Sequence, residues 1–351
     1  MNEFLSRTTL PRHTPEVNCN SKSGEGEQNM GLINLDKCYG QLICPRCSSS
    51  LLVENASFRC SSETCPNSTT PFPIIRDKPV IIDFDASVVS LEDVLSTSGA
   101  SLIRRFTYPR LRRLFQAVNN PRNRRTEENI TQMLDFLRSH SNHSSKPLTL
   151  VIGGGTMGHG TEELYAAEDI HTLAFDIYWS PVIQLLADGQ RIPLADSSVD
   201  GVLIQAVLEH VLEPNTVVQE IHRVLRSGGV VYSETPFTQQ VHEGAFDFTR
   251  FSDSGHRYLF RDFELISSGE VAGPGTQLVW SIEHFMRALF RSRAAGYLAR
   301  LSTFWIGRLD RFLDPQFSID GASSVYFLGR KSMSRMSAHD VISYYQGAQR
   351  G

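Results

Sequence analysis

A glycine-rich turn followed by an aspartate is the feature of this chain whose residue types and spacing most clearly indicate chemistry. The apolar run 148–152 predicts a strand, and it leads into Gly153, Gly154 and Gly155. Because glycine carries no Cβ, a ligand can approach such a turn closely. Asp176 ends the next apolar run, where a carboxylate is placed to accept hydrogen bonds from a ribose diol. The pattern predicts a nucleotide-type pocket at the carboxyl edge of a parallel sheet.

Two nucleotide-binding folds share this opening, and the residues that follow separate them. Gly153-x-Gly155-x-x-Gly158 also satisfies the dinucleotide fingerprint. The stretch 187–200, Ala-Asp-Gly-x-x-x-Pro-Leu-x-Asp-x-x-x-Asp, has no role in a dinucleotide pocket, and Val-Leu-Glu-His-Val follows at 207–211. As a set, these motifs resemble class I S-adenosylmethionine-dependent methyltransferases over roughly residues 148–238.

The resemblance implies a fold, a cofactor and a set of contacts. The fold is a doubly wound α/β domain with a seven-stranded, mostly parallel sheet, and the cofactor is S-adenosylmethionine. Asp176 would hold the ribose, Asp188 and Gly189 would meet the adenine, and Gln205 would line the methionine end beside the glycine turn. One departure stands out, because Val151 occupies a strand position where the family usually carries an acid.

Four cysteines in one window predict a metal site. They are spaced as two pairs on tight turns, Cys44-x2-Cys47 and Cys60-x4-Cys65, with a short predicted hairpin between them. Such a set is typical of a structural zinc site with four thiolates. Two disulfides are the alternative, which a cytosolic chain disfavours. The segment resembles the zinc ribbon of some ribosomal RNA guanine methyltransferases, and the zinc-binding activator subunit of certain transfer-RNA and protein methyltransferases.

Composition places the chain among ordinary globular proteins. It has 351 residues, of which 40% are hydrophobic and 21% charged, and a formal net charge of −4. This balance gives no general attraction to nucleic acid. No apolar run reaches the length of a membrane span and the N-terminus has no apolar signal core, so we expect a cytoplasmic protein.

The predicted organisation has five parts. They are a disordered tail at 1–38, a zinc-ribbon-like domain at 39–86, a helical connector at 87–146, a methyltransferase domain at 147–331 with a helical insert at about 276–315, and a tail at 332–351. The connector is arginine-rich, which indicates either a solvated face or a contact for phosphate on substrate or RNA. The insert reads as a buried helical hairpin, or as a basic amphipathic surface that touches lipid or a lipid-linked substrate.

Catalytic candidates lie just beyond a predicted strand that ends at Pro236. Loops at the carboxyl edge of a sheet commonly carry chemistry. His242 is the natural general base for a hydroxyl, because the pKa of histidine lies near neutrality. Glu243 or Asp247 would orient it, and His256 is a second candidate base. The alternative is that His242 and Asp247 only brace the loop.

These observations predict a methyltransferase that acts on oxygen or nitrogen of a small-molecule, glycan or lipid-linked substrate. An RNA methyltransferase that grips RNA through its zinc ribbon is one alternative, and a non-catalytic partner protein that has lost cofactor affinity is another. The sequence does not indicate an oligomeric state.

Overall fold

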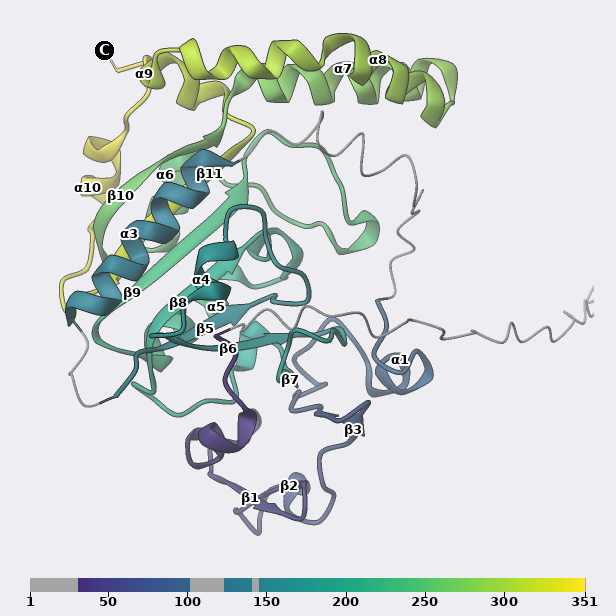
Figure 1. The fold of residues 1–351 in the computed structure, drawn as a ribbon, viewed down its shortest axis with the longest axis vertical. Coiled ribbons are helices and arrows are strands. Elements are labelled where there is room, and N and C mark those ends of the chain that lie inside the picture. Colours follow the sequence, from purple (N-terminus) through teal and green to yellow (C-terminus); the bar gives the residue numbers. More distant parts are fainter. Residues whose placement is uncertain (1–30, 102–122, 141–144, 351) are drawn as a thin grey trace, which may run out of the picture.

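A seven-stranded sheet organises the computed structural model, which describes residues 31–101, 123–140 and 145–350 (Figure 1). The strands are β5 (Leu148–Ile152), β6 (His171–Asp176), β7 (Leu185–Leu186), β8 (Val199–Gln205), β9 (Leu225–Pro236), β10 (Phe263–Ala272) and β11 (Ser324–Lys331). They lie in the order β10-β11-β9-β8-β5-β6-β7, and only β11 runs against its neighbours. The predicted doubly wound, mostly parallel sheet is confirmed.

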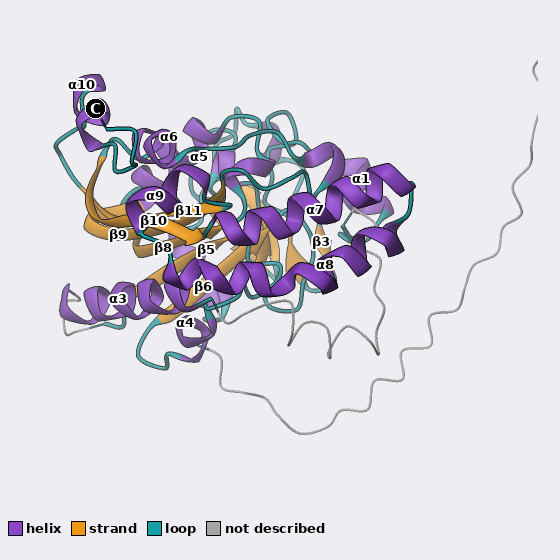
Figure 2. Cartoon of the chain, turned by 90° about the horizontal axis from the view of Figure 1, so that it is seen from above, coloured by secondary structure: helices purple, strands orange, loops and turns teal. Residues whose placement is uncertain are grey.

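Helices cover both faces of the sheet, as Figure 2 shows. One face carries α3 (Arg124–His140) and α4 (Glu162–Ala166), and the other carries α5 (Pro214–Val224) and α6 (Asp253–Leu259). Successive side chains of a strand point to opposite faces, so Leu150 joins one core and Val151 the other. Burial on both faces explains why the strands read as near-continuous apolar runs.

The N-terminal part packs beside the β7 edge of the sheet. Its elements are β1 (Leu51–Glu54), β2 (Ser57–Cys60), β3 (Ile74–Ile75), β4 (Lys78–Pro79) and α1 (Leu91–Ser96). The hairpin β1–β2 is the one expected between the cysteine pairs. Leu32 bridges to Thr172 of β6, and Ile33 is buried. Residues 31–38 are therefore packed chain, which corrects the expected disordered tail over that stretch, while 1–30 lie outside the described residues.

A long helical hairpin, α7 (Pro274–Phe290) and α8 (Arg293–Gly307), follows β10 and extends past the sheet (Figure 1). Two short helices follow, α9 (Pro315–Ser318) and α10 (Ala338–Tyr344). The expectation of a buried hairpin is wrong, because Val279 is the single buried residue of α7 and Gly296 that of α8. Most residues of the two helices are half-buried or exposed.

Short 3-10 turns complete the chain. They are Leu35–Gln41, Pro66–Ser68, Gly189–Arg191, Leu208–His210, Gly244–Phe246, Arg308–Phe312 and Ile319–Gly321. Residues 102–122 and 141–144 of the expected helical connector lie outside the described residues. Within the described ranges, no helix combines the length and the apolar character needed to span a membrane.

Candidate functional site

One large cavity lies at the carboxyl ends of β5, β6, β8 and β9. Its volume is about 1090 Å³, and its wall includes Gly153, Asp176, Gln205 and Glu234 from those four strand ends. Ligand pockets commonly measure about 300–1,000 Å³. The cavity is thus large enough for a nucleotide-sized cofactor together with a second molecule.

The glycine turn lies directly above β5 and needs glycine for steric reasons. Gly153 has a φ of 75°, and a Cβ added there would lie 2.2 Å from Cγ2 of Val207. A Cβ on Gly154 would lie 2.8 Å from Cβ of Ala174. Val151 fills the position of the missing acid, and its side chain is buried beneath the turn. The turn is therefore held by packing, and its backbone borders the cavity.

Asp176 and Asp188 both line this half of the cavity. Asp176 Oδ2 accepts from the Gly155 N–H at 2.9 Å, and its Oδ1 accepts from the Tyr178 N–H at 3.0 Å. Asp188 is buried, which raises the pKa of its carboxyl. It accepts hydrogen bonds from the Gln190 N–H at 2.8 Å and from the Ser87 hydroxyl at 2.6 Å.

Ser87 is a site residue that the sequence analysis missed. It belongs to the connector, and its partner Asp188 lies 101 positions further along the chain. Nearby, the Ala86 carbonyl accepts from the Gln190 side chain at 3.0 Å. Gly189 lies between these contacts and also borders the cavity. The connector therefore forms part of the wall beside Asp188, and no local motif indicates this.

Glu234, at the end of β9, is a second missed residue. Its carboxyl accepts hydrogen bonds from Thr126 and Tyr232 and, at 2.6 Å, from the Gln205 amide. Complete burial raises the pKa of Glu234. Gln205 is thereby fixed at the β8 tip, and the next residue, Ala206, has a left-handed φ of 53°. Such a conformation is costly outside glycine and is concentrated at functional sites.

Beyond Glu234 the cavity continues to the loop that follows β9. His242 lines it and is partly exposed, whereas Asp247 lies beneath with a side chain only 1% exposed. His242 donates its backbone N–H to Asp247 Oδ2 at 2.9 Å, and Arg250 donates to the same carboxylate at 3.0 Å. Burial opposes ionisation of Asp247, but Arg250 and His242 outweigh it and lower its pKa to about 2. Asp247 is therefore an anchor for the loop rather than a proton carrier.

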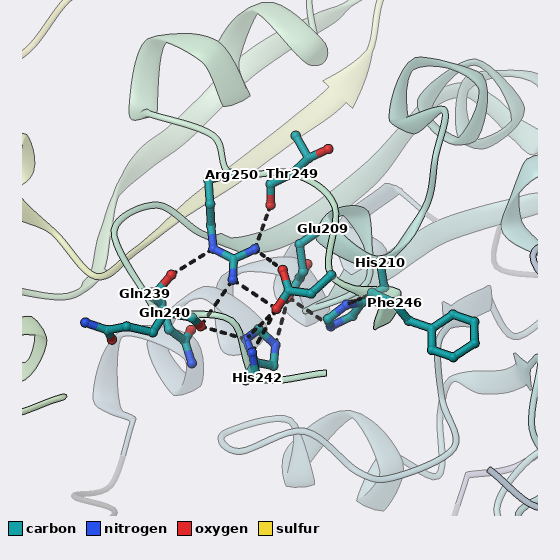
Figure 3. Close-up of polar contacts among 9 residues, drawn as sticks. Glu209, His210, Gln239, Gln240, His242, Phe246, Thr249 and Arg250 are labelled. Carbon is teal, nitrogen blue, oxygen red and sulfur yellow. Dashed lines mark hydrogen bonds and ion pairs between the residues drawn. The ribbon is translucent and has the colours of Figure 1, made fainter. Parts of the chain in front are cut away.

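Glu209 and His210, from the turn after β8, face His242 across the same cavity (Figure 3). His242 Nε2 lies 3.7 Å from Glu209 Oε1, and His210 Nε2 lies 3.5 Å from the same oxygen. Burial lowers the pKa of His242, but the Glu209 and Asp247 carboxylates outweigh it, and the net shift is upward. The sequence analysis did not assign Glu209 a role.

His256 does not belong to this cluster. It is fully buried on α6, packs against Phe260 and Phe327, and its Nε2 lies 3.0 Å from the Ser233 hydroxyl. Burial lowers its pKa to about 3. The expectation that His256 is a second base is therefore wrong, because the side chain is neutral, enclosed in the core and absent from the cavity wall.

The four cysteines converge at a separate place. Their sulfurs all lie within 4.8 Å of one another, with 3.8 Å between Cys44 and Cys65 and 3.3 Å between Cys47 and Cys60. Tetrahedral thiolates bonded to zinc at about 2.3 Å would be about 3.8 Å apart. None of the cysteines among the described residues forms a disulfide. The donor set therefore fits zinc better than it fits two disulfides.

A family model described as a methyltransferase domain matches residues 163–233, and no curated protein matches the chain. Among solved structures, the chain is similar to a putative sarcosine dimethylglycine methyltransferase from Galdieria sulphuraria, with 16% identity, a TM-score of 0.39, and coverage of 59% of this chain and 86% of that one.

Two further similar structures have comparable scores. One is a 1,6-didemethyltoxoflavin-N1-methyltransferase from Burkholderia thailandensis, at 15% identity, a TM-score of 0.36, and coverage of 66% of this chain and 94% of that one. The other is phosphoethanolamine N-methyltransferase 2 from Haemonchus contortus, at 13% identity, a TM-score of 0.36, and coverage of 58% and 53% respectively. With the strand order, the glycine turn and the family match over 163–233, the chain carries a class I S-adenosylmethionine-dependent methyltransferase domain.

Proposed function

We propose that the chain binds S-adenosylmethionine in the half of the cavity bounded by the glycine turn and the two aspartates, here called the cofactor half. Gly153, Gly154 and Gly155 would border the cofactor with backbone alone. Asp176 would accept from the ribose hydroxyls, since each of its oxygens can accept a second hydrogen bond. Asp188 would accept from the adenine amino group. Gly189 would lie beneath the adenine, and Gln205 would border the methionine end.

The chain's own groups fit such a cofactor. The glycine turn is a cradle that side chains would fill, and two carboxylates, Asp176 and Asp188, line the same cavity. When bound, S-adenosylmethionine supplies a methyl group whose transfer breaks a carbon–sulfur bond and returns the electron pair to sulfur. The protein has to align the acceptor and to remove a proton from the attacking oxygen or nitrogen. His242 is the residue that we propose for action on that proton, with Asp247 as its anchor.

The acceptor half is the part of the cavity from Glu209 and His242 to the helical hairpin. Its wall includes Trp280 and Phe304 together with Arg300 and Arg308, so an apolar surface alternates with cationic groups. This combination supports an acceptor with an apolar part and a polar or anionic part. We infer a lipid-linked or other amphiphilic acceptor, in preference to a small fully polar one.

The outer surface of the hairpin supports the same class of acceptor. Large apolar side chains are exposed along this stretch: Leu278, Phe285 and Leu289 on α7, Leu298 and Trp305 on α8, and Leu309 and Phe312 in the 3-10 turn that follows. Six arginines lie along the same stretch: Arg287, Arg291, Arg293, Arg300, Arg308 and Arg311. Apolar stripes flanked by cations are typical of helices that lie in the interface of an anionic membrane.

One observation carries the proposal, namely a single cavity that runs from the glycine turn to this hairpin. The experiment is a methyl-uptake assay with labelled S-adenosylmethionine on separated cell fractions. Uptake into the lipid extract is the expected result. Uptake only into the water-soluble fraction would contradict the lipid-linked acceptor. Uptake into RNA would favour the alternative function, an RNA methyltransferase that binds RNA through its zinc ribbon.

A second assay isolates the hairpin. We expect the protein to float with vesicles of phosphatidylcholine and phosphatidylserine, and a Phe285→Ser, Leu298→Ser double variant to lose this. Ile342→Ser, which removes an exposed apolar side chain of α10, is the matched control and should float as the unchanged protein does. Equal flotation of all three proteins would contradict the role of the hairpin.

We also infer that Cys44, Cys47, Cys60 and Cys65 hold one structural zinc, remote from the chemistry. The small hairpin between them cannot bury enough apolar surface to fold alone, so metal binding would supply the free energy. Elemental analysis should find about one zinc per chain, as a closed four-thiolate site requires. In this proposal 39–86 is a zinc-ribbon-like domain, 87–146 a connector, 147–331 the catalytic domain, and 332–351 a tail of which 332–350 is described.

A further inference from the structure

Glu209 is a buried carboxylate in the cavity wall. It is 0% exposed, and neither carboxylate oxygen has a hydrogen-bond partner among the described residues. A buried carboxylate is normally hydrogen-bonded, paired with a charge or bound to a metal, because burial of an unpaired charge is very costly. Among the residues that the structure describes, the ring nitrogens of His210 and His242 form ion-pair contacts with its Oε1, at 3.5 and 3.7 Å.

Both imidazoles present the same nitrogen to Glu209. His210 Nδ1 lies 2.7 Å from the Phe246 carbonyl, which fixes Nδ1 as a donor and turns Nε2 towards Glu209. His242 Nδ1 lies 3.4 Å from Asp247 Oδ2 and 3.4 Å from the Gln240 carbonyl, so its Nε2 is likewise directed at Glu209. The two rings lie edge to face with centroids 5.0 Å apart (Figure 3).

This is the arrangement that metal-binding histidines show in proteins. The distal nitrogen binds the cation, and the other nitrogen donates to a carbonyl or carboxylate that fixes the tautomer and the ring orientation. The three ligand atoms lie within 4.8 Å of one another. Ligands bonded at about 2.1 Å to a tetrahedral ion are about 3.4 Å apart, so a small contraction closes the site.

The surrounding loop is fixed independently of any ion. The backbone N–H groups of Phe248 and Thr249 donate to the Glu209 carbonyl at 2.8 and 3.3 Å. Arg250 holds Asp247, and Asp247 in turn holds the backbone of His242. The two segments that supply the ligands are therefore joined by hydrogen bonds, and the ligand atoms are held in position before a cation arrives.

We propose that Glu209, His210 and His242 bind a divalent first-row transition-metal ion at the acceptor end of the cavity. Two imidazoles and one carboxylate suit such ions, and three protein ligands leave positions for substrate or water. This deepens the proposed function and rests on it, because it assigns oxygen as the acceptor atom. Held by these three residues, such an ion would favour loss of the proton of an acceptor hydroxyl to water. The oxygen would then form its bond to the methyl carbon while the carbon–sulfur electron pair returns to sulfur. In this arrangement His242 would act on the acceptor proton as a ligand of the ion.

The test measures metal binding directly and does not need the acceptor. Untagged protein with its cysteine site saturated with zinc is dialysed against Co²⁺, which does not displace zinc from thiolates because it binds more weakly. Cobalt and zinc are then determined by elemental analysis. We expect about one cobalt per chain, and at least tenfold weaker binding in Glu209→Gln and in His242→Ala.

Glu243→Gln is the matched control, because it removes a neighbouring carboxylate of the same cavity wall and should bind cobalt as the unchanged protein does. Glu209 is buried, so the folded state of each variant is verified by thermal melting; His242→Ala, in the partly exposed loop, tests the same site with less risk to folding. No cobalt in the unchanged protein, or equal cobalt in His242→Ala, would overturn the proposal.

Titration of S-adenosylmethionine on the same samples separates the two proposals. Binding of the cofactor without cobalt contradicts only the metal site and leaves the proposed function in place. Binding of cobalt without the cofactor contradicts the proposed function and leaves a metal site of other use.

Discussion

The two halves of the cavity are built in different ways. The cofactor half is made by strand ends and the backbone of a glycine turn, and its aspartates accept hydrogen bonds from backbone N–H groups and from the Ser87 hydroxyl. The acceptor half is made by side chains from a loop, a turn and the helical hairpin, held through contacts between distant segments. A rigid sheet edge suits a ligand that never changes, whereas loops can vary with the substrate. Because the two halves are built separately, we expect a mutation in the acceptor half to change turnover and one in the cofactor half to change affinity for S-adenosylmethionine.

The largest expected effect lies in the acceptor half. His242→Ala should lower turnover by about 10²–10⁴, the usual worth of assistance to proton transfer. Affinity for S-adenosylmethionine, measured by calorimetry, should stay the same, because the hydrogen bonds and ion pairs given for His242 within the described ranges go to Glu209, Gln240 and Asp247 of the acceptor half. Val241→Ala is the control from the same loop. Loss of turnover and cofactor affinity together would show that His242 only braces the loop.

The mirror-image change in the cofactor half is Asp176→Ala. We expect S-adenosylmethionine to bind more weakly by roughly 1.5–3 kcal/mol, the range for a lost hydrogen bond to a charged group. Cobalt binding at the acceptor end should be unaffected. Asp196→Ala, which removes an exposed carboxylate away from the cavity, is the control for charge. Undiminished affinity in the Asp176 variant would mean that the ribose contact is misassigned.

A third variant, at His256, tests whether this histidine is neutral in the core, in contrast to His242 in the cavity. The pKa of His256 is about 3 in the folded chain, below the ordinary 6.5, so the unfolded chain binds the proton first. The free energy of unfolding should therefore fall as pH drops from about 6.5 towards 3. In His256→Gln this part of the pH dependence should disappear. Urea titrations at pH 7, 6 and 5 give the free energy of unfolding at each pH. If this free energy depends on pH equally in both proteins, the result counts against a buried, neutral His256.

The smallest expected effect concerns the connector. Ser87→Ala removes one hydroxyl donor from Asp188 and should weaken S-adenosylmethionine binding by about 0.5–1.5 kcal/mol. Turnover at saturating cofactor should not change, because Ser87 belongs to the cofactor half. The matched control is Ser90→Ala, a helix cap of the same segment that does not reach the cavity. A change in turnover with unaltered cofactor affinity would break the division between the halves.

The sequence predicted the local parts of the molecule well. The sheet class, the glycine turn, and the positions of Asp176 and Asp188 at strand ends follow from apolar runs and glycine spacing. The convergence of the four cysteines follows from their pairing on tight turns. In each case the residues that matter are neighbours along the chain or lie at one edge of a parallel sheet.

The missed residues depend on long-range packing. Ser87 meets Asp188 only because the connector folds back on the sheet, and Glu234 meets Gln205 only because β9 lies beside β8. Glu209 has no recognisable role in the sequence, because only the tertiary structure brings His242 opposite it. His256 was misjudged for the same reason, since its residue type suits a base but only the tertiary structure shows its burial.

The proposed docking of the exposed hairpin stripes on a membrane would have a kinetic consequence. A chain held by this surface on a bilayer meets its acceptor by lateral diffusion within the membrane plane. Its rate then follows the number of acceptor molecules per unit of membrane area, and dilution of the acceptor with inert lipid slows it even when the bulk concentration is constant. In detergent micelles the measured rate would be low, because each micelle carries few acceptor molecules.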